Sequence, residues 1–271
     1  MKFDMNRAWR DASEMVIANR EVLLIVAGLF FFLPGLAAVL LIPSMQPPAE
    51  IKESEAIAFM TQFYTDNALW IILLAVVQTV GVLTLLGLLR GHAKPTVGDA
   101  LKAGIVGILP YLGAQILFSL GVAAILGLLI GVAMATGLKL LIAVAAIATF
   151  ILLVYALIKI SLVPAVIAIE RVTNPVTVLL RSWSLTKGNS FRLLLFYALL
   201  LIVFIVITAV IGAISGLLLA LVGTGAASTI GEAIVSGLLG AIVTVYFVAI
   251  LASIHRQLAG PSAEMIGRTF E

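Results

Sequence analysis

Long stretches without a charged residue constrain this chain more than any other feature of its sequence. Ala103–Leu138 and Leu193–Gly231 contain no Asp, Glu, Lys or Arg, and shorter apolar runs lie on either side of them. About 20 apolar residues in a helix cross the roughly 30 Å hydrocarbon core of a bilayer. The chain is 63% apolar and 11% charged, whereas a soluble domain averages about 25% charged residues. We therefore expect an all-α, polytopic integral membrane protein.

Six membrane spans follow from the places where charged residues, prolines and glycines interrupt the apolar runs. The predicted spans are Val22–Ile42, Ala68–Leu89, Leu109–Ala135, Leu140–Val163, Leu193–Leu221 and Ala233–Ile254. Pro34 and Gly35 are expected to kink the first span, because proline lacks the N–H that a helix interior needs. Lys159, near the end of the fourth span, is expected to extend to the lipid headgroups. We expect three helical hairpins in one membrane domain, residues 1–271.

Short amphipathic helices are expected on the membrane surface before and between the spans. In residues 1–20, Trp9 falls on an apolar side and Arg7 on a charged side, which places Trp9 at headgroup depth; the alternative is a soluble tail. The mixed charges of this segment do not fit a cleavable signal peptide. A second surface helix is expected within Ala49–Asn67. A third follows a cap at Thr96 and is expected to face lipid with Val97, Ala100 and Leu101.

The central polar stretch, Pro164–Arg192, carries the sharpest local signals. Asn174 is a good N-cap, Pro175 a good first helical residue and Gly188 a good C-terminal stop. The helix between them is expected to rest on the membrane surface through one apolar face, made of Val176, Leu179, Leu180 and Trp183.

Glu170 is the only acidic residue between Asp99 and Glu232, and it follows the fourth predicted span. A carboxylate at the edge of the lipid is poorly solvated and is stabilised by a partner. The break at Asn174–Pro175 lets the next helix fold back and bring Arg181 toward Glu170. A planar guanidinium can donate two hydrogen bonds to a carboxylate. We predict this ion pair; the alternative is a solvated Glu170 that only flanks the span.

Lysine and arginine are unequally divided between the two sides of the predicted topology. Fourteen of the 16 lie on the side that holds both termini, and only Lys52 and Lys139 lie on the other. Because basic loops stay in the cytoplasm, we expect both termini there. The basic face, with Trp9 and Trp183 beside it, suits anionic lipid headgroups. Ordinary topology signalling needs the same residues.

One order of elements occurs three times along the chain: an amphipathic segment, a span, a turn and a returning span. These units are residues 1–90, 91–164 and 165–258, and Arg7-Ala8-Trp9 in the first corresponds to Arg181-Ser182-Trp183 in the third. A threefold repeat about an axis along the membrane normal explains this order. Any membrane protein built of hairpins shows the same order, so both explanations stay open.

The predicted spans contain no carboxylate and no histidine. Their uncharged polar residues include Gln78, Thr79, Thr84, Gln115, Ser119, Tyr155, Thr208, Ser215 and Tyr246. Ionisable residues inside the membrane usually mark ion pathways, so a proton-coupled transporter or a cation channel is disfavoured. Cysteine is absent, and His92 and His255 are expected to be solvated at helix ends. We expect no catalytic residue, no metal and no cofactor.

Three Gly-x-x-x-Gly pairs occur in the apolar runs, at positions 87 and 91, 127 and 131, and 212 and 216. Such pairs let helix backbones approach closely. We expect them to pack helices within the chain rather than between copies of it.

The central stretch resembles a known membrane domain. The residues that carry the resemblance are Pro164, Glu170, Pro175, Leu180-Arg181-Ser182-Trp183, Leu185-Thr186 and Gly188. Their pattern is similar to the membrane domain attached to some glycerophosphoryl diester phosphodiesterases and to the related YciC-like bacterial inner-membrane proteins. The resemblance implies a six-span module of the bacterial inner membrane with a role in lipid or envelope homeostasis. In those enzymes hydrolysis belongs to a separate soluble barrel, so no catalytic residue is carried over.

Three functions remain in view. We favour a non-enzymatic inner-membrane module that is associated with lipids or the envelope and acts with partners, which are membrane lipids, a protein partner or a second copy, with no nucleic acid. The runner-up is a transporter or channel for a neutral or lipidic substrate, which requires an open lateral or hydrophilic cavity between the hairpins. The third is an enzyme acting on lipid headgroups, which requires Glu170, Asp99 and a histidine to converge.

Overall fold

The computed structural model describes residues 2–42, 53–90, 95–221, 223 and 225–260, and within them it is entirely helical. The elements are α1 (Met5–Ala18), α2 (Arg20–Ala27), the π-helical turn η1 (Gly28–Phe32), α3 (Leu33–Leu41), α4 (Glu53–Asp66), α5 (Ala68–Leu88), α6 (Val97–Val106), α7 (Ile108–Ala135), α8 (Lys139–Ile160), α9 (Val163–Glu170), α10 (Pro175–Thr186), α11 (Ser190–Ala220) and α12 (Ala226–Ala259). Six helical stretches are long and apolar enough to cross a membrane, the number of spans that the sequence predicts.

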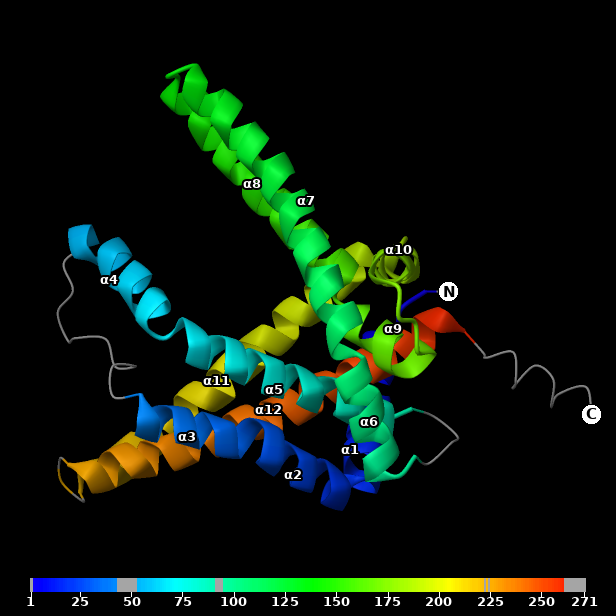
Figure 1. Cartoon of the computed structure of the whole chain (residues 1–271), viewed down its shortest axis with the longest axis vertical. Coiled ribbons are helices and arrows are strands. Elements are labelled where there is room, and N and C mark those ends of the chain that lie inside the picture. The colour runs from blue at the N-terminus through cyan, green and yellow to red at the C-terminus, as the bar shows by residue number, and fades with distance from the viewer. Residues whose placement is uncertain (1, 43–52, 91–94, 222, 224, 261–271) are drawn as a thin grey trace, which may run out of the picture.

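The six long stretches form two parts that meet at one end (Figure 1). The α2–η1–α3 stretch, α5, α11 and α12 run beside one another, whereas α7 and α8 pair with each other and leave the rest at a wide angle as an arm. In each of the two spans that contain α7 and α8, only 6% of the most apolar 18-residue segment is buried. The corresponding share for α5 is 39%. The arm therefore presents almost all of its apolar surface outward.

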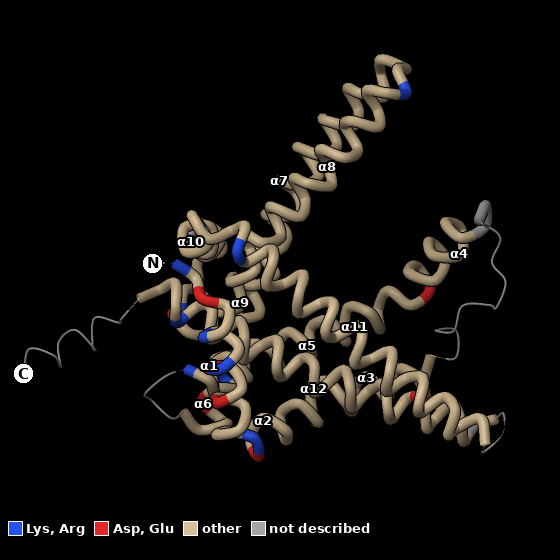
Figure 2. Tube along the Cα trace, turned by 180° about the vertical axis from the view of Figure 1, so that it is seen from behind, with Lys and Arg blue, Asp and Glu red and all other residues tan. Residues whose placement is uncertain are grey.

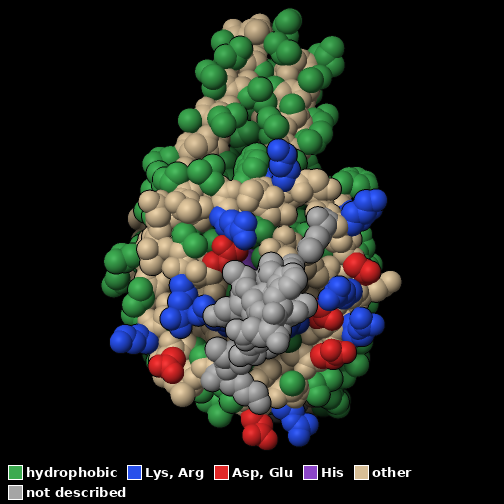
Figure 3. Space-filling model, turned by 90° about the vertical axis from the view of Figure 1, so that its right-hand side faces the viewer, with side chains coloured by type: hydrophobic (Ala, Val, Ile, Leu, Met, Phe, Trp, Pro, Cys, Tyr) green, Lys and Arg blue, Asp and Glu red, His purple; other side chains and the backbone are tan. Residues whose placement is uncertain are grey.

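Charged residues gather where the two parts meet (Figures 2 and 3). We call this region, with α1, α6, α9 and α10, the charged end. Each long stretch begins or ends there, beside Arg20, Arg90, Lys102, Lys159, Arg192 or Arg256. The start of the chain and the last turns of α12 also meet there, because the Asp4 N–H donates to Gln257 Oε1 at 3.1 Å. This contact is consistent with the even number of spans that the sequence predicts.

The core lies between α12, α9, α5 and the start of the chain. Ile250 and Ile254 of α12, Val166 of α9 and Leu86 of α5 are fully buried. The first span approaches α5 through its π-helical turn, where the Leu33 N–H donates to the Gly28 carbonyl. The first span therefore departs from a regular α-helix about one turn before Pro34, the residue at which a kink was predicted.

The structure of α6 differs in part from the prediction that this helix lies on the membrane surface and faces lipid. Thr96 caps it as expected, since its hydroxyl accepts from the Asp99 N–H at 3.2 Å. However, α6 packs along α5, and Ala100, expected to face lipid, is 2% exposed. A β-carbon on Gly87 would lie 3.5 Å from that of Ala100, so small residues allow the two helices this contact.

The prediction that Lys159 extends to the lipid headgroups is wrong. Its side chain is 2% exposed instead of extending to the headgroups. The ammonium lies 5.3 Å from the ring centres of Tyr155 and Trp183, close enough for cation–π attraction to both. Trp183 is on α10, so the folded-back helix covers the lysine.

Two of the three Gly-x-x-x-Gly pairs do not pack helices as predicted, whereas Gly87 of the first pair does contact α6. A β-carbon added to Gly127, Gly131, Gly212 or Gly216 would meet no atom within 4 Å. Gly91 lies outside the described residues. Glycines outside these pairs also permit close approach, such as Gly81, where an added β-carbon would lie 2.6 Å from Cβ of Phe30.

Candidate functional site

Glu170 lies at the centre of a three-residue cluster at the charged end. Arg181 Nε donates to both carboxylate oxygens, at 3.1 Å to Oε1 and 3.0 Å to Oε2. His255 Nε2 lies 2.8 Å from Oε1. The predicted Glu170–Arg181 pair is therefore present, although one N–H spans both oxygens in place of the expected two-pronged fork.

Local sequence signals bring these side chains together. Helix α9 ends at Glu170 because Arg171 adopts a left-handed conformation, with φ of 56°. Asn174 then caps α10, accepting from the N–H groups of Val176 and Thr177 at 2.9 and 3.2 Å. Folded back in this way, α10 is fixed to α8 by the Ser182 hydroxyl, which donates to the Lys159 carbonyl at 2.7 Å.

His255 corrects the expectation of a solvated histidine. It is 3% exposed, and its Nδ1 has no hydrogen-bond partner in the described residues. A neutral ring that carries its hydrogen on Nε2 can donate to the charged Glu170 without leaving a buried N–H unpaired. The cluster therefore joins the consecutive helices α9 and α10 to α12, which is distant from both in sequence. No signal in the sequence pairs positions 170 and 255; His92 lies outside the described residues.

The remaining predicted residues lie around this cluster. Pro164 and Pro175 are in the first turns of α9 and α10, and Gly188 follows α10 with φ of 79°. Val176, Leu180 and Trp183 of α10 point outward, while Val178, Ser182 and Leu185 are buried. In α1, Trp9 stacks on Tyr246 at 6.0 Å between ring centres, and Arg7 lies 3.6 Å from Asp11.

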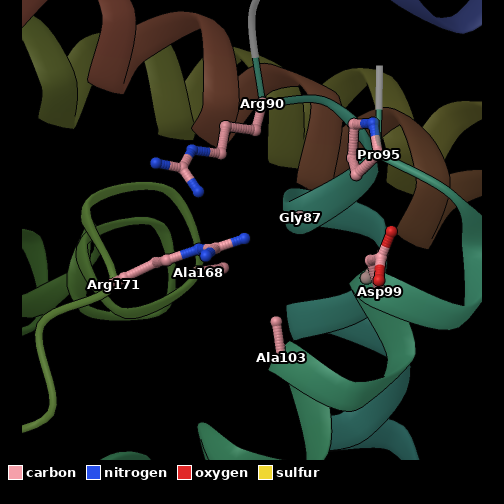
Figure 4. Close-up of a pocket in the computed structure, with 8 residues that line it drawn as sticks. Gly87, Arg90, Pro95, Asp99, Ala103, Ala168 and Arg171 are labelled. Atoms are coloured by element: carbon pink, nitrogen blue, oxygen red, sulfur yellow. The ribbon is translucent and has the colours of Figure 1, made fainter. Parts of the chain in front are cut away.

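A small pocket lies beside the cluster (Figure 4). It has a volume of about 40 Å³, and its lining residues come from α5, α6, α9 and their flanks. Arg90 and Arg171 direct their guanidinium groups toward the same space, and Asp99 lies on the opposite side. No ion pair joins either arginine to another residue in the described part of the chain.

The cluster and the pocket have different chemical capabilities. The enzyme interpretation requires Glu170, Asp99 and a histidine to meet, and among the residues that the structure describes only Glu170 and His255 do so. Asp99 belongs to the pocket, where its carboxylate accepts from the Thr96 hydroxyl at 2.7 Å. No group of three His, Asp or Glu in the described ranges could hold a metal ion. The pocket instead presents two guanidinium groups, which bind phosphate and carboxylate oxygens.

Comparison of the chain with protein-family models, with curated proteins and with solved structures finds no match.

Proposed function

We propose that the protein is a non-enzymatic module of the bacterial inner membrane whose charged end binds the anionic headgroups of membrane lipids. The observation that carries this proposal is the convergence of Arg90 and Arg171 on one pocket. The resemblance to YciC-like proteins agrees with it and is itself part of the proposal, as are the threefold repeat and a protein partner.

Electrostatics favours an anion in that pocket. Two guanidinium groups that share a space repel each other, and a phosphate between them would replace repulsion with charge-assisted hydrogen bonds. Each arginine follows the C-terminus of a helix, α5 or α9, where a cation is stabilised by the helix dipole. That effect explains a cation at each helix end, but it gives no reason for the two side chains to point into one space.

Lipid binding tests the proposal. We expect Arg90→Gln with Arg171→Gln to weaken binding of phosphatidylglycerol to the purified protein at least about tenfold, since charge-assisted hydrogen bonds are lost. The measurement is retention of the lipid in native mass spectrometry. The matched control is Lys187→Gln with Arg256→Gln, which removes the same charge from exposed residues of the same end. Equal losses in both variants would mean that only total charge matters, and the pocket would have no role.

The proposal also includes a cytoplasmic position for the charged end, and this part can be tested separately. The absence of cysteine allows single substitutions to be labelled cleanly. Thr136→Cys is at the tip of the arm and Ser184→Cys is on α10, and both positions are exposed. In spheroplasts we expect an impermeant maleimide to label the first and not the second. Labelling of Ser184→Cys from outside would reverse the proposed orientation.

A further inference from the structure

A second cavity, distinct from the charged-end pocket, is lined by residues of α5, α7 and α9. Figure 1 shows where these three helices lie. It has a volume of about 270 Å³. Apolar walls come from Val82, Leu83 and Pro164, and three hydrogen-bonding side chains, Gln78, Thr79 and Tyr111, also line it. No charged residue lines it, so its chemistry differs from that of the charged end.

The cavity lies deep in the membrane and opens toward lipid. Gln78 is ten residues before the last residue of α5, Leu88, at the charged end. At 1.5 Å per residue this places it about 15 Å from that end, near the middle of a roughly 30 Å hydrocarbon core. Gln78 and Ala75, both on the cavity wall, are exposed side chains of α5.

Gln78 is the unexplained group in this cavity. No other described residue hydrogen-bonds to its side chain, whereas the other two polar residues are partly satisfied. An amide without a partner in hydrocarbon is costly, because no water is present to replace the missing bonds. The site therefore calls for a polar group supplied from outside the chain.

The hydrogen-bonding pattern specifies that group. Tyr111 Oη accepts from Gln115 Nε2 at 3.3 Å, so its own hydrogen is free to be donated. Thr79 Oγ1 donates to the Ala75 carbonyl at 2.7 Å, so its lone pairs can accept. The Gln78 amide can do both. Donors and acceptors side by side match a hydroxyl group, which also donates and accepts.

We propose that this cavity binds the hydroxyl group of an uncharged lipid, such as a diacylglycerol or a long-chain alcohol, that enters sideways from the bilayer. The apolar walls contact the first carbons of the lipid, and the open side lets its chains remain in the membrane. The proposal is independent of headgroup binding at the charged end.

Photolabelling tests the site. The protein in phosphatidylcholine nanodiscs is irradiated with a diazirine-bearing diacylglycerol, or with the same probe whose hydroxyl is replaced by hydrogen. We expect the hydroxylated probe to label peptides of α5 and α7. Gln78→Leu, which keeps the volume and removes the hydrogen bonds, should lower this labelling about fivefold, the effect of one hydrogen bond. Val82→Trp should abolish it by filling the cavity.

The matched control is Leu128→Trp, which adds the same side chain to an exposed position of the arm outside the cavity. Equal labelling by the two probes, or labelling unchanged in Gln78→Leu, would overturn the proposal and leave a cavity that holds water only. A disulfide formed by Gln78→Cys between two copies in membranes would assign Gln78 to a dimer contact instead. If variants misfold, competition on the unmodified protein decides: unlabelled diacylglycerol must suppress labelling, and its hydroxyl-free analogue must not.

Discussion

Replacement of Glu170 by alanine is expected to lower the free energy of unfolding by about 2–3 kcal/mol. The reason is that two partners lose their acceptor at once. The side chain of His255 is 4% exposed, so its N–H would be left buried and unpaired. The side chain of Arg181 is 41% exposed and can be solvated by water, so its loss of partner contributes less.

Double-mutant cycles separate the two contributions. Unfolding is measured by titration with sodium dodecyl sulfate in mixed micelles. The variants are the single mutants Glu170→Ala, Arg181→Gln and His255→Phe, and the two double mutants that combine Glu170→Ala with each of the others. We expect a coupling energy of about 1–3 kcal/mol between Glu170 and His255, and at most about 1 kcal/mol between Glu170 and Arg181. Strictly additive losses in both cycles would mean that the cluster does not hold α9, α10 and α12 together.

Substitution of Gly81 by alanine is expected to destabilise the protein by about 1–3 kcal/mol, the range for overpacking a close contact. A β-carbon at this position would lie 2.6 Å from Phe30 Cβ and 2.7 Å from Phe31 Cζ. Because Phe30 Cβ is attached directly to the backbone, a change of rotamer cannot move it away. The π-helical turn η1 must therefore separate from α5.

Gly131→Ala is the matched control for this prediction. It makes the same change in a helix at a site with no atom within 4 Å of the added carbon. Since alanine is the better helix former, we expect Gly131→Ala to be neutral or slightly stabilising. The measurement is the same detergent titration. Similar losses in both variants would show that the effect does not come from the contact with Phe30.

Features set by local chemistry could be predicted from the sequence. Long uncharged runs give the six candidate spans, and Asn174, Pro175 and Gly188 give the bounds of α10. The Glu170–Arg181 pair was also predictable, because its partners are 11 residues apart with a helix break between them.

Features set by long-range packing could not be predicted. His255 reaches Glu170 from 85 residues away, and nothing in either neighbourhood marks the contact. Lys159 was expected to extend to the headgroups because lysine usually does so, but Trp183 on the folded-back α10 covers it. The glycine motifs misled for a related reason. The Gly-x-x-x-Gly spacing shows that one side of a helix carries small residues that would allow another helix to approach closely. Only the fold decides whether another helix packs there.

The position of α12 in the core has a consequence for the order of assembly. Synthesis runs from the N-terminus, so α1 is made first and α12 is the last described helix to be made. Ala8 and Ala12 of α1 are fully buried in the finished protein, where α1 packs against α12. They can be covered in this way only after the last helix has inserted. Until then the earlier spans lack their central neighbour, so the core is complete only when α12 has inserted.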